Sequence, residues 1–189
     1  AELATRDIET KIVVLDIEES FNRERTMEYD YHYDDLEDYI AKWFDLVVYR
    51  HNSYKASAGK ITEDMDFYKI LYIIPSIDTL FSRLSDDRKD KLKLILEKSE
   101  ADFNIHIILS SSSSRYATMT HEPWYRKHCT SGNGIWIGDG FTERMQISVN
   151  RVTKELYQPI GPAYAIVVQK GRYNLVKVVS VEEREDELV

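Results

Sequence analysis

Three short apolar segments, separated by longer polar stretches, predict the buried strands of a parallel sheet. They are residues 11–16 (KIVVLD), 69–74 (KILYII) and 104–109 (NIHIIL). A continuous apolar run suits a strand that is covered on both faces, because polar and apolar residues alternate only where one face meets solvent. Pro75 is expected to end the second strand, since proline cannot donate a hydrogen bond to a neighbouring strand.

Helical spacing of apolar residues occurs between these strands. Residues 34–51 form one predicted helix behind Asp34 and Asp35, with apolar positions at Leu36, Ile40, Trp43 or Phe44, and Val47. Residues 53–66 are polar and predict a loop with a short helical turn. Ser85 is expected to cap a second helix whose apolar positions are Leu92, Ile95, Leu96 and Phe103. The order strand, helix, strand at this length predicts a parallel crossover.

The last third of the chain has a different pattern, because six of the seven glycines lie between Gly132 and Gly171. Residues 121–128 predict a short helix. Residues 132–140 (GNGIWIGDG) predict turns around a short strand, with Trp136 buried in that strand. The apolar runs 163–169 and 173–179 flank Lys170-Gly171-Arg172 and predict a tight β-hairpin. Residues 182–189 form an acidic tail, and its residues 182–187 are expected to fray.

Composition bounds the class of protein. The 189 residues, 43% hydrophobic and 31% charged, suit one globular domain with a real core. The net charge of -8 argues against nonspecific binding of nucleic acid. Cys129 is the single cysteine, so an internal disulfide is excluded and a reducing compartment is expected. No apolar run approaches the roughly 20 residues of a membrane-spanning helix, and residues 1–6 look like the last turns of a helix in a longer protein.

Several familiar motifs are incomplete. A phosphate-binding loop at residues 54–62 has Gly59-Lys60, but Tyr54 replaces the first glycine and Ile61 the hydroxyl residue. The glycines of 132–140 do not fit the dinucleotide fingerprint. His121, His128 and Cys129 have no fourth metal ligand nearby and are expected to be structural. The serine run 110–114 lacks the glycines of a nucleophile elbow.

Four residues are nevertheless candidates for a ligand site because of their position at the ends of the predicted strands. Ser110 and Ser111 directly follow a predicted buried strand, at the edge where open α/β sheets bind ligands. Asp16 and Asp78 stand at or just beyond the ends of the other two strands. A nucleotide-binding fold keeps acids there, near a metal-bound nucleotide. Solvated loop acids are the alternative explanation for both aspartates.

Taken together, these segments resemble the C-terminal ATPase module of the FtsK/SpoIIIE-type membrane protein of type VII secretion, the EssC or YukB kind. The resemblance covers nearly the whole chain. Its most specific parts are residues 134–140 (GIWIGDG) and 160–179, which begin IGP and end in the predicted hairpin. The strand patterns alone suit many nucleotide-binding folds.

The resemblance implies a fold, a location and partners. The fold is a three-layer RecA-like P-loop NTPase domain with a mostly parallel sheet and a C-terminal β-hairpin, occupying residues 1–189 as one domain truncated at its N-terminus. The location is the cytoplasmic face of the cell membrane, within a homo-oligomeric motor. The partners are the neighbouring ATPase modules and the small secreted Trp-Xaa-Gly helical-hairpin proteins, with no nucleic acid. ATP and magnesium serve the intact family, and no cofactor is expected in this chain.

Departures from the family pattern bear on activity. The P-loop of such a module would lie upstream of Ala1, and the metal-site acid that closes the second strand aligns with Pro75. Asp78 matches the second acid of that segment. The resemblance therefore implies remnants of a nucleotide site at Asp16, Asp78, Ser110 and Ser111, with no catalytic residue. The expected role is substrate recognition or regulation of neighbouring modules. The alternative is an active ATP-hydrolysing motor domain, and DNA translocation is disfavoured by the charge.

Overall fold

Residues 10–18, 30–31, 35–60, 62, 65, 67–100, 103–143 and 146–178 are the part of the chain that the computed structural model describes. The chain divides into two compact units, Ala1–Tyr116 and Ala117–Val189. The expected helix end at residues 1–6 and the acidic tail lie outside the described residues. The expectation of a single domain stays a prediction, because two compact units can belong to one domain.

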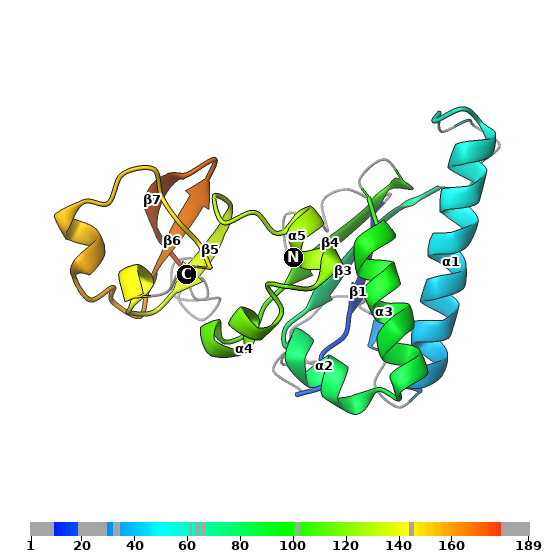
Figure 1. The fold of residues 1–189 in the computed structure, drawn as a ribbon, viewed down its shortest axis with the longest axis horizontal. Helices are drawn as coiled ribbons and strands as arrows, with labels where there is room; N and C mark the ends of the chain where they lie inside the picture. Colours follow the sequence, from blue (N-terminus) through cyan, green and yellow to red (C-terminus); the bar gives the residue numbers. More distant parts are fainter. Residues whose placement is uncertain are drawn as a thin grey trace, which may run out of the picture. The chain divides into compact units, whose positions relative to one another are not determined.

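Unit 1 contains a four-stranded parallel sheet (Figure 1) in the order β2-β1-β3-β4. Its strands are β1 (Thr10–Val14), β2 (Asp30–Tyr31), β3 (Lys69–Ile74) and β4 (Ile105–Leu109). Val13, Val14, Ile70 and Ile74 are at most 1% exposed, as expected for inner strands of a parallel sheet. The three strands predicted from apolar runs, and the parallel pairing of the second with the third, are confirmed.

The prediction that the third of these strands is fully buried is wrong. In β4 only Ile105 is buried, and Ile108 is 50% exposed. This exposure follows from the position of β4 at the edge of the sheet, where it has a neighbouring strand, β3, on one side only among the described strands.

Helix α1 (Leu36–Ala56) confirms the first predicted helix and extends it beyond the predicted end. Trp43 is the buried aromatic residue, and its ring stacks on Tyr72 of β3 with 3.9 Å between ring centroids. Residues 53–56, predicted as loop, are helical. The helix ends at Ala56, and in the turn that follows Gly59 adopts a left-handed conformation (φ 78°) and donates its N–H to the Tyr54 carbonyl at 2.9 Å.

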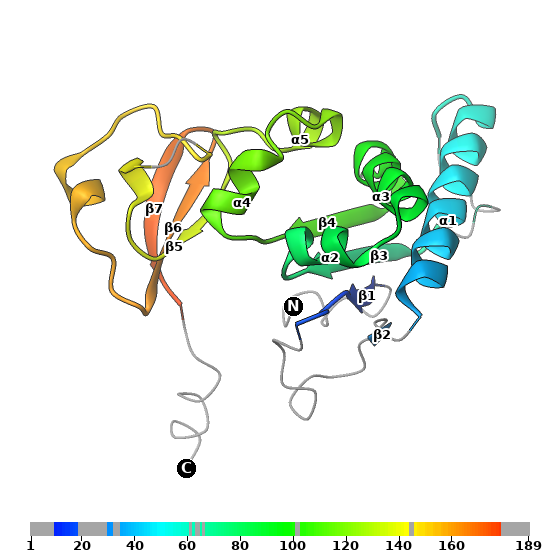
Figure 2. The same ribbon diagram turned by 60° about the horizontal axis from the view of Figure 1, so that its bottom comes forward.

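Helices α2 (Ile77–Arg83) and α3 (Asp86–Lys98) connect β3 to β4. Ser85 occupies the position before α3, as predicted, but its hydroxyl donates to Glu37 Oε2 at 2.8 Å rather than capping the helix. Phe103 lies beyond the end of α3 and packs its ring on Tyr54, so its assignment to that helix is wrong. In Figures 1 and 2, α1 and α3 lie side by side.

Unit 2 contains an antiparallel sheet in the order β5-β6-β7. Its strands are β5 (Gly134–Ile137), β6 (Tyr164–Gln169) and β7 (Arg172–Lys177), with short helices α5 (Pro123–His128), η4 (Phe141–Glu143) and η5 (Lys154–Tyr157). Helix α4 (Ser113–Thr118) contains the boundary between the units. The hairpin is confirmed, with a two-residue turn in which Lys170 and Gly171 both have positive φ, as a type I′ turn requires.

One face of this second sheet packs on the core of unit 2. The buried core residues are Phe141, Leu156, Ile166 and Val168. Trp136 packs against this core, as predicted, but its side chain is only partly buried and not fully buried as expected. The reason is that β5 is an edge strand, which β6 covers from one side only.

The architecture is therefore an α/β fold with a small parallel sheet plus a three-stranded antiparallel sheet. The finer expectation of a three-layer RecA-like domain stays a prediction.

Candidate functional site

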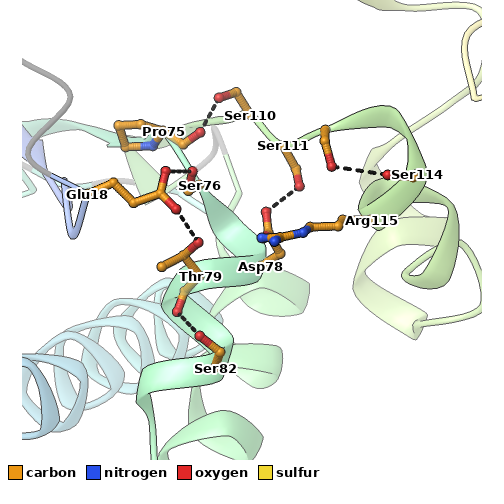
Figure 3. A network of polar contacts seen from close by, with 11 residues as sticks. Glu18, Pro75, Ser76, Asp78, Thr79, Ser82, Ser110, Ser111, Ser114 and Arg115 are labelled. Atoms are coloured by element: carbon orange, nitrogen blue, oxygen red, sulfur yellow. Dashed lines mark hydrogen bonds and ion pairs between the residues drawn. The ribbon is translucent and has the colours of Figure 1, made fainter.

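The loops that follow β1, β3 and β4 meet at one edge of the parallel sheet, because parallel strands all end at the same side. A network of polar side chains joins these loops and the first turn of α2 (Figure 3). Its members come from the segment after β1, from residues 75–82 and from residues 110–115. We call this set the carboxyl-edge network.

Glu18, four residues beyond the end of β1, forms the first half of the network. Its carboxylate accepts hydrogen bonds from Thr79 Oγ1 at 2.6 Å and from Ser76 Oγ at 2.7 Å. Ser76 precedes α2 at the N-cap position, but its hydroxyl turns to Glu18 and makes no cap bond. The hydrogen bonds from Thr79 and Ser76 hold the pKa of Glu18 below its usual value.

Asp78, in the first turn of α2, forms the second half. Its side chain is 12% exposed, and its two carboxylate oxygens accept a hydrogen bond from Ser111 Oγ and one from the Arg115 guanidinium, which is also an ion pair. Burial acts to raise the pKa of Asp78, but the contacts from Ser111 and Arg115 outweigh it, so the pKa lies below the ordinary value. Asp78 is therefore ionised at neutral pH and holds Arg115.

Backbone contacts fix the serine loop against the end of β3. Ser110 donates its N–H to the Ile74 carbonyl at 3.0 Å, and its own carbonyl accepts from the N–H of Ile77 at 3.1 Å. The Ser110 hydroxyl also donates to the Pro75 carbonyl. Pro75 thus acts as a hydrogen-bond acceptor at the end of the strand.

The structure brings together two of the four predicted site residues, Asp78 and Ser111, in a direct hydrogen bond. Ser110 binds Pro75, and Asp16 lies two residues beyond β1 with 4% of its surface exposed. Sequence reasoning missed five members: Glu18, Ser76, Thr79, Ser82 and Arg115. All of them lie in the segments that follow a strand, and this position is the one signal that the sequence offers. No rule of sequence spacing pairs Glu18 with Ser76 and Thr79, which lie 58 and 61 positions later in the chain.

The network combines carboxylates with hydroxyls that already have acceptors within the chain. Three carboxylates, those of Asp16, Glu18 and Asp78, lie at this edge; such acids repel a polyphosphate that carries no metal ion, and nucleotide-binding folds use them beside the metal. The hydroxyls of Ser76, Thr79 and Ser111 already donate to carboxylates of the chain, and that of Ser110 donates to a backbone carbonyl. Since its pKa is lowered, Asp78 is also a weak base and would not activate Ser111 as a nucleophile.

The other candidate motifs do not assemble into a site among the described residues. Gly59 and Lys60 follow α1 instead of preceding a helix, which is the opposite of a phosphate-binding loop. His121 lies before α5 and His128 is its last residue, so the two do not share that helix as the prediction assumed. Among the described residues, no three side chains of the histidine, cysteine, aspartate and glutamate types gather closely enough to hold a metal ion.

A second feature lies on unit 2. Ile135 and Ile137 of β5 are 64% and 72% exposed, and they point away from the core that Trp136 contacts, because side chains alternate along a strand. The pairing of strands places three more apolar residues on the same face, namely Ala165, which is 2% exposed, and Val167 and Val176, which are half-buried. We call these five residues the apolar sheet face. Arg172 and Asn174 share the face at its hairpin end and form a polar rim.

The fold defined by these elements is of the α/β class, and comparison with known proteins refines that statement. No family model matches the sequence, and no curated protein matches it. Among solved structures, the chain is similar to the cytoplasmic domain of EssC, with a TM-score of 0.64 and 12% sequence identity. The match covers 88% of this chain and 33% of that one, so this chain spans about a third of that domain. A likeness at this identity shows the fold.

Membrane insertion of a helix is not supported by the described residues, since none of their helices combines the length and the apolar character that a bilayer crossing needs.

Proposed function

We propose that this chain is a degenerate ATPase-fold module of a type VII secretion motor, which recognises a secreted substrate or regulates the neighbouring modules. Two independent observations support the proposal. The segments that end in GIWIGDG and in the hairpin resemble the last module of such motors, and the fold is similar to that of the cytoplasmic domain of EssC. On this proposal the module acts at the cytoplasmic face of the membrane, in a homo-oligomer.

The carboxyl-edge network is the observation that favours binding over ATP hydrolysis. Phosphoryl transfer depends on positioned magnesium and on cations that hold the phosphates. At this edge Pro75 replaces an acid, and Asp78 engages the Arg115 guanidinium. We therefore expect Mg-ATP to bind no tighter than about millimolar, near -4 kcal/mol. Micromolar affinity in titration calorimetry would instead support the active motor.

The apolar sheet face is the surface that we propose for the substrate. Sheets bury an apolar face against another element, and a helix is a common covering element. The polar rim at Arg172 and Asn174 can set the register of such a helix. The proposed occupant is the helical C-terminal tail of a small secreted Trp-Xaa-Gly protein, with its apolar residues at i, i+3 or i+4 spacing against Ile135 and Ile137.

Fluorescence anisotropy of labelled tail peptides tests this assignment. We expect micromolar binding, about -8 kcal/mol, with little dependence on salt because apolar burial dominates. Ile137→Ser should weaken binding roughly ten- to a hundred-fold, which is the effect of losing one buried isoleucine contact. Val152→Ser is the matched control, since Val152 is 50% exposed and is not among the five residues of the face.

Each outcome of that titration has a distinct meaning. Equal weakening by both substitutions would contradict the apolar sheet face as the docking surface. Failure of every tail to bind, together with tight binding of duplex DNA, would overturn substrate recognition altogether.

A further inference from the structure

The outer edge of β7 has no neighbouring strand among the described residues, because β7 is the last strand in the order β5-β6-β7 (Figure 1). The hairpin turn decides which backbone groups lie on that edge. In a two-residue hairpin the residues that flank the turn, here Gln169 and Arg172, form a hydrogen-bonded pair, and such pairs alternate along the ladder. The Val178 N–H donates to the Ala163 carbonyl at 2.6 Å, which agrees with this alternation.

The same alternation directs the backbone N–H and C=O groups of Tyr173, Leu175 and Lys177 away from β6. At the hairpin end, the Tyr173 hydroxyl contacts Thr153 at 2.6 Å and Glu155 at 3.2 Å. Among the described residues, nothing hydrogen-bonds to the outward backbone groups of Leu175 and Lys177. This part of β7 therefore offers donors and acceptors at the spacing of a strand, which is what an added strand pairs with.

The Leu175 side chain extends the core face of the sheet to this edge. It lies on the same face as Tyr173 and opposite Ile166, and both of these residues belong to the core of unit 2. Leu175 is nevertheless 57% exposed, whereas Ile166 is 1% exposed. A strand added beside β7 would cover Leu175 with an apolar side chain of its own, because residues opposite each other on one face of a sheet are in contact.

The charges of β7 indicate the kind of strand that fits. Arg172 and Lys177 stand at the two ends of β7, and the strand has no acidic residue. Both side chains are exposed, and neither forms an ion pair among the described residues. Lysine on an edge strand discourages pairing with an apolar or basic strand. A strand with an acid at each end would instead place a carboxylate opposite each cation, and such cross-strand pairs are favourable.

We propose that the outer edge of β7 binds an extended acidic peptide of a partner protein by antiparallel strand addition. The antiparallel direction follows from the sheet, in which every described pair of strands is antiparallel. An apolar side chain of the peptide lies opposite Leu175, and its acids lie opposite Arg172 and Lys177. This inference rests on unit 2 alone and does not depend on the docking of a tail helix on the apolar sheet face.

Alternate backbone methylation of a probe peptide gives the first test, by fluorescence anisotropy with the full chain. The probe is the labelled peptide Glu-Thr-Leu-Thr-Leu-Glu, whose leucines lie opposite Leu175 and Tyr173 in the proposed register. N-methylation of both leucines removes the N–H groups that face β7 and should weaken binding roughly ten- to a hundred-fold. N-methylation of both threonines is the matched control. It alters N–H groups that point away from β7 and should change affinity by less than about two-fold.

Side-chain substitutions give the second test. Leu175→Ser alters a side chain that is 57% exposed and should weaken binding of the probe roughly three- to ten-fold. Ile135→Ser is the matched control, since Ile135 is 64% exposed and lies in β5 at the opposite edge of the same sheet. It should leave the affinity for the probe unchanged. A probe with glutamine in place of both glutamates should bind roughly three- to ten-fold more weakly at low salt, and the difference should shrink at high salt.

Two other occupants of the edge are distinguished by the same measurements. A chain that ends at Ser180 lacks the acidic residues 182–187, and it should bind the probe as the full chain does. Binding by the shortened chain alone would mean that the chain's own acidic tail occupies the edge. A dimer in sedimentation that Leu175→Ser dissociates would mean that a second copy occupies it. Either result, equal effects of the two methylation patterns, or failure of the probe to bind would overturn the proposal.

Discussion

Trp43 offers a test of the core of unit 1 in which two physical effects oppose each other. Its side chain is 2% exposed and stacks on Tyr72 at 3.9 Å, with 20° between the ring planes. Its indole Nε1 is buried and has no hydrogen-bond partner among the described residues. Burial of the ring stabilises the fold, whereas burial of an unsatisfied N–H opposes it.

The two effects predict different results for two substitutions. Trp43→Ala removes the whole ring and should cost about 3–5 kcal/mol. Trp43→Phe loses two carbon atoms and Nε1, which is about 1.6 kcal/mol at roughly 0.8 kcal/mol per buried carbon. It also relieves the buried N–H, worth about 1–3 kcal/mol, and keeps a ring on Tyr72. The terms nearly cancel, so Trp43→Phe should change stability by less than about 1.5 kcal/mol.

Urea unfolding followed by helical circular dichroism is the assay, because the long helices α1 and α3 both belong to unit 1. The midpoint and the slope together give the free energy of unfolding. Val48→Ala, on the same helix at 39% exposure, should stay within about 0.5 kcal/mol. If Trp43→Phe costs as much as Trp43→Ala, the indole N–H is satisfied in solution and the reasoning fails.

Three further predictions concern other parts of the chain. Trp136→Ala should lower the free energy of unfolding by about 2–3 kcal/mol, measured by thermal unfolding, because it removes a partly buried ring and the hydrogen bond from Nε1 to the Gly138 carbonyl. The loss is smaller than for a fully buried tryptophan. In the control Ile137→Ala, at 72% exposure, the free energy of unfolding should change by less than about 0.5 kcal/mol. Gly171→Ala should destabilise unit 2 by more than about 1 kcal/mol, because φ is 71° and a Cβ would collide with the Asn150 side chain. The pKa of Asp78 is lower in the folded chain than in the unfolded chain, so its stabilisation is present above the unfolded value of roughly 3.9 and is lost as pH falls through the folded value. Native and Asp78→Asn proteins should therefore differ in urea midpoint at pH 7 and converge in strong acid, and a constant difference would contradict this.

Local patterns were sufficient to predict the elements whose environment is set by neighbouring residues. The apolar runs at residues 11–16 and 69–74 predicted inner strands, and Pro75 predicted the end of the second. The exposure of Ile108 could not be predicted in this way, because it depends on which strand stands at the edge of the sheet. The same holds for Trp136, whose strand lies at the edge of the second sheet.

The polar contacts were harder to predict than the strands. Residues at strand ends were identified as candidates, but the partners of Glu18 lie 58 and 61 positions away, and those of Asp78 lie 33 and 37 positions away. Only the parallel order of the strands brings these loops together. Arg50 shows the same limit, since helical spacing places it on the buried face of α1, yet its contact with the Phe103 carbonyl spans 53 positions.

The carboxyl-edge network and the apolar sheet face belong to different units, and this leads to a last prediction about function. The carboxyl-edge network belongs to unit 1 and is occupied by contacts of the chain with itself, whereas the apolar sheet face belongs to unit 2 and leaves Ile135 and Ile137 exposed. If the sheet face binds the tail directly, Asp78→Asn should leave tail affinity within about two-fold, since Asp78 is not one of the residues of that face. Loss of tail binding in Asp78→Asn, with native hydrogen exchange in unit 2, would mean that the substrate also contacts the sheet edge, and the direct-docking assignment would then be wrong.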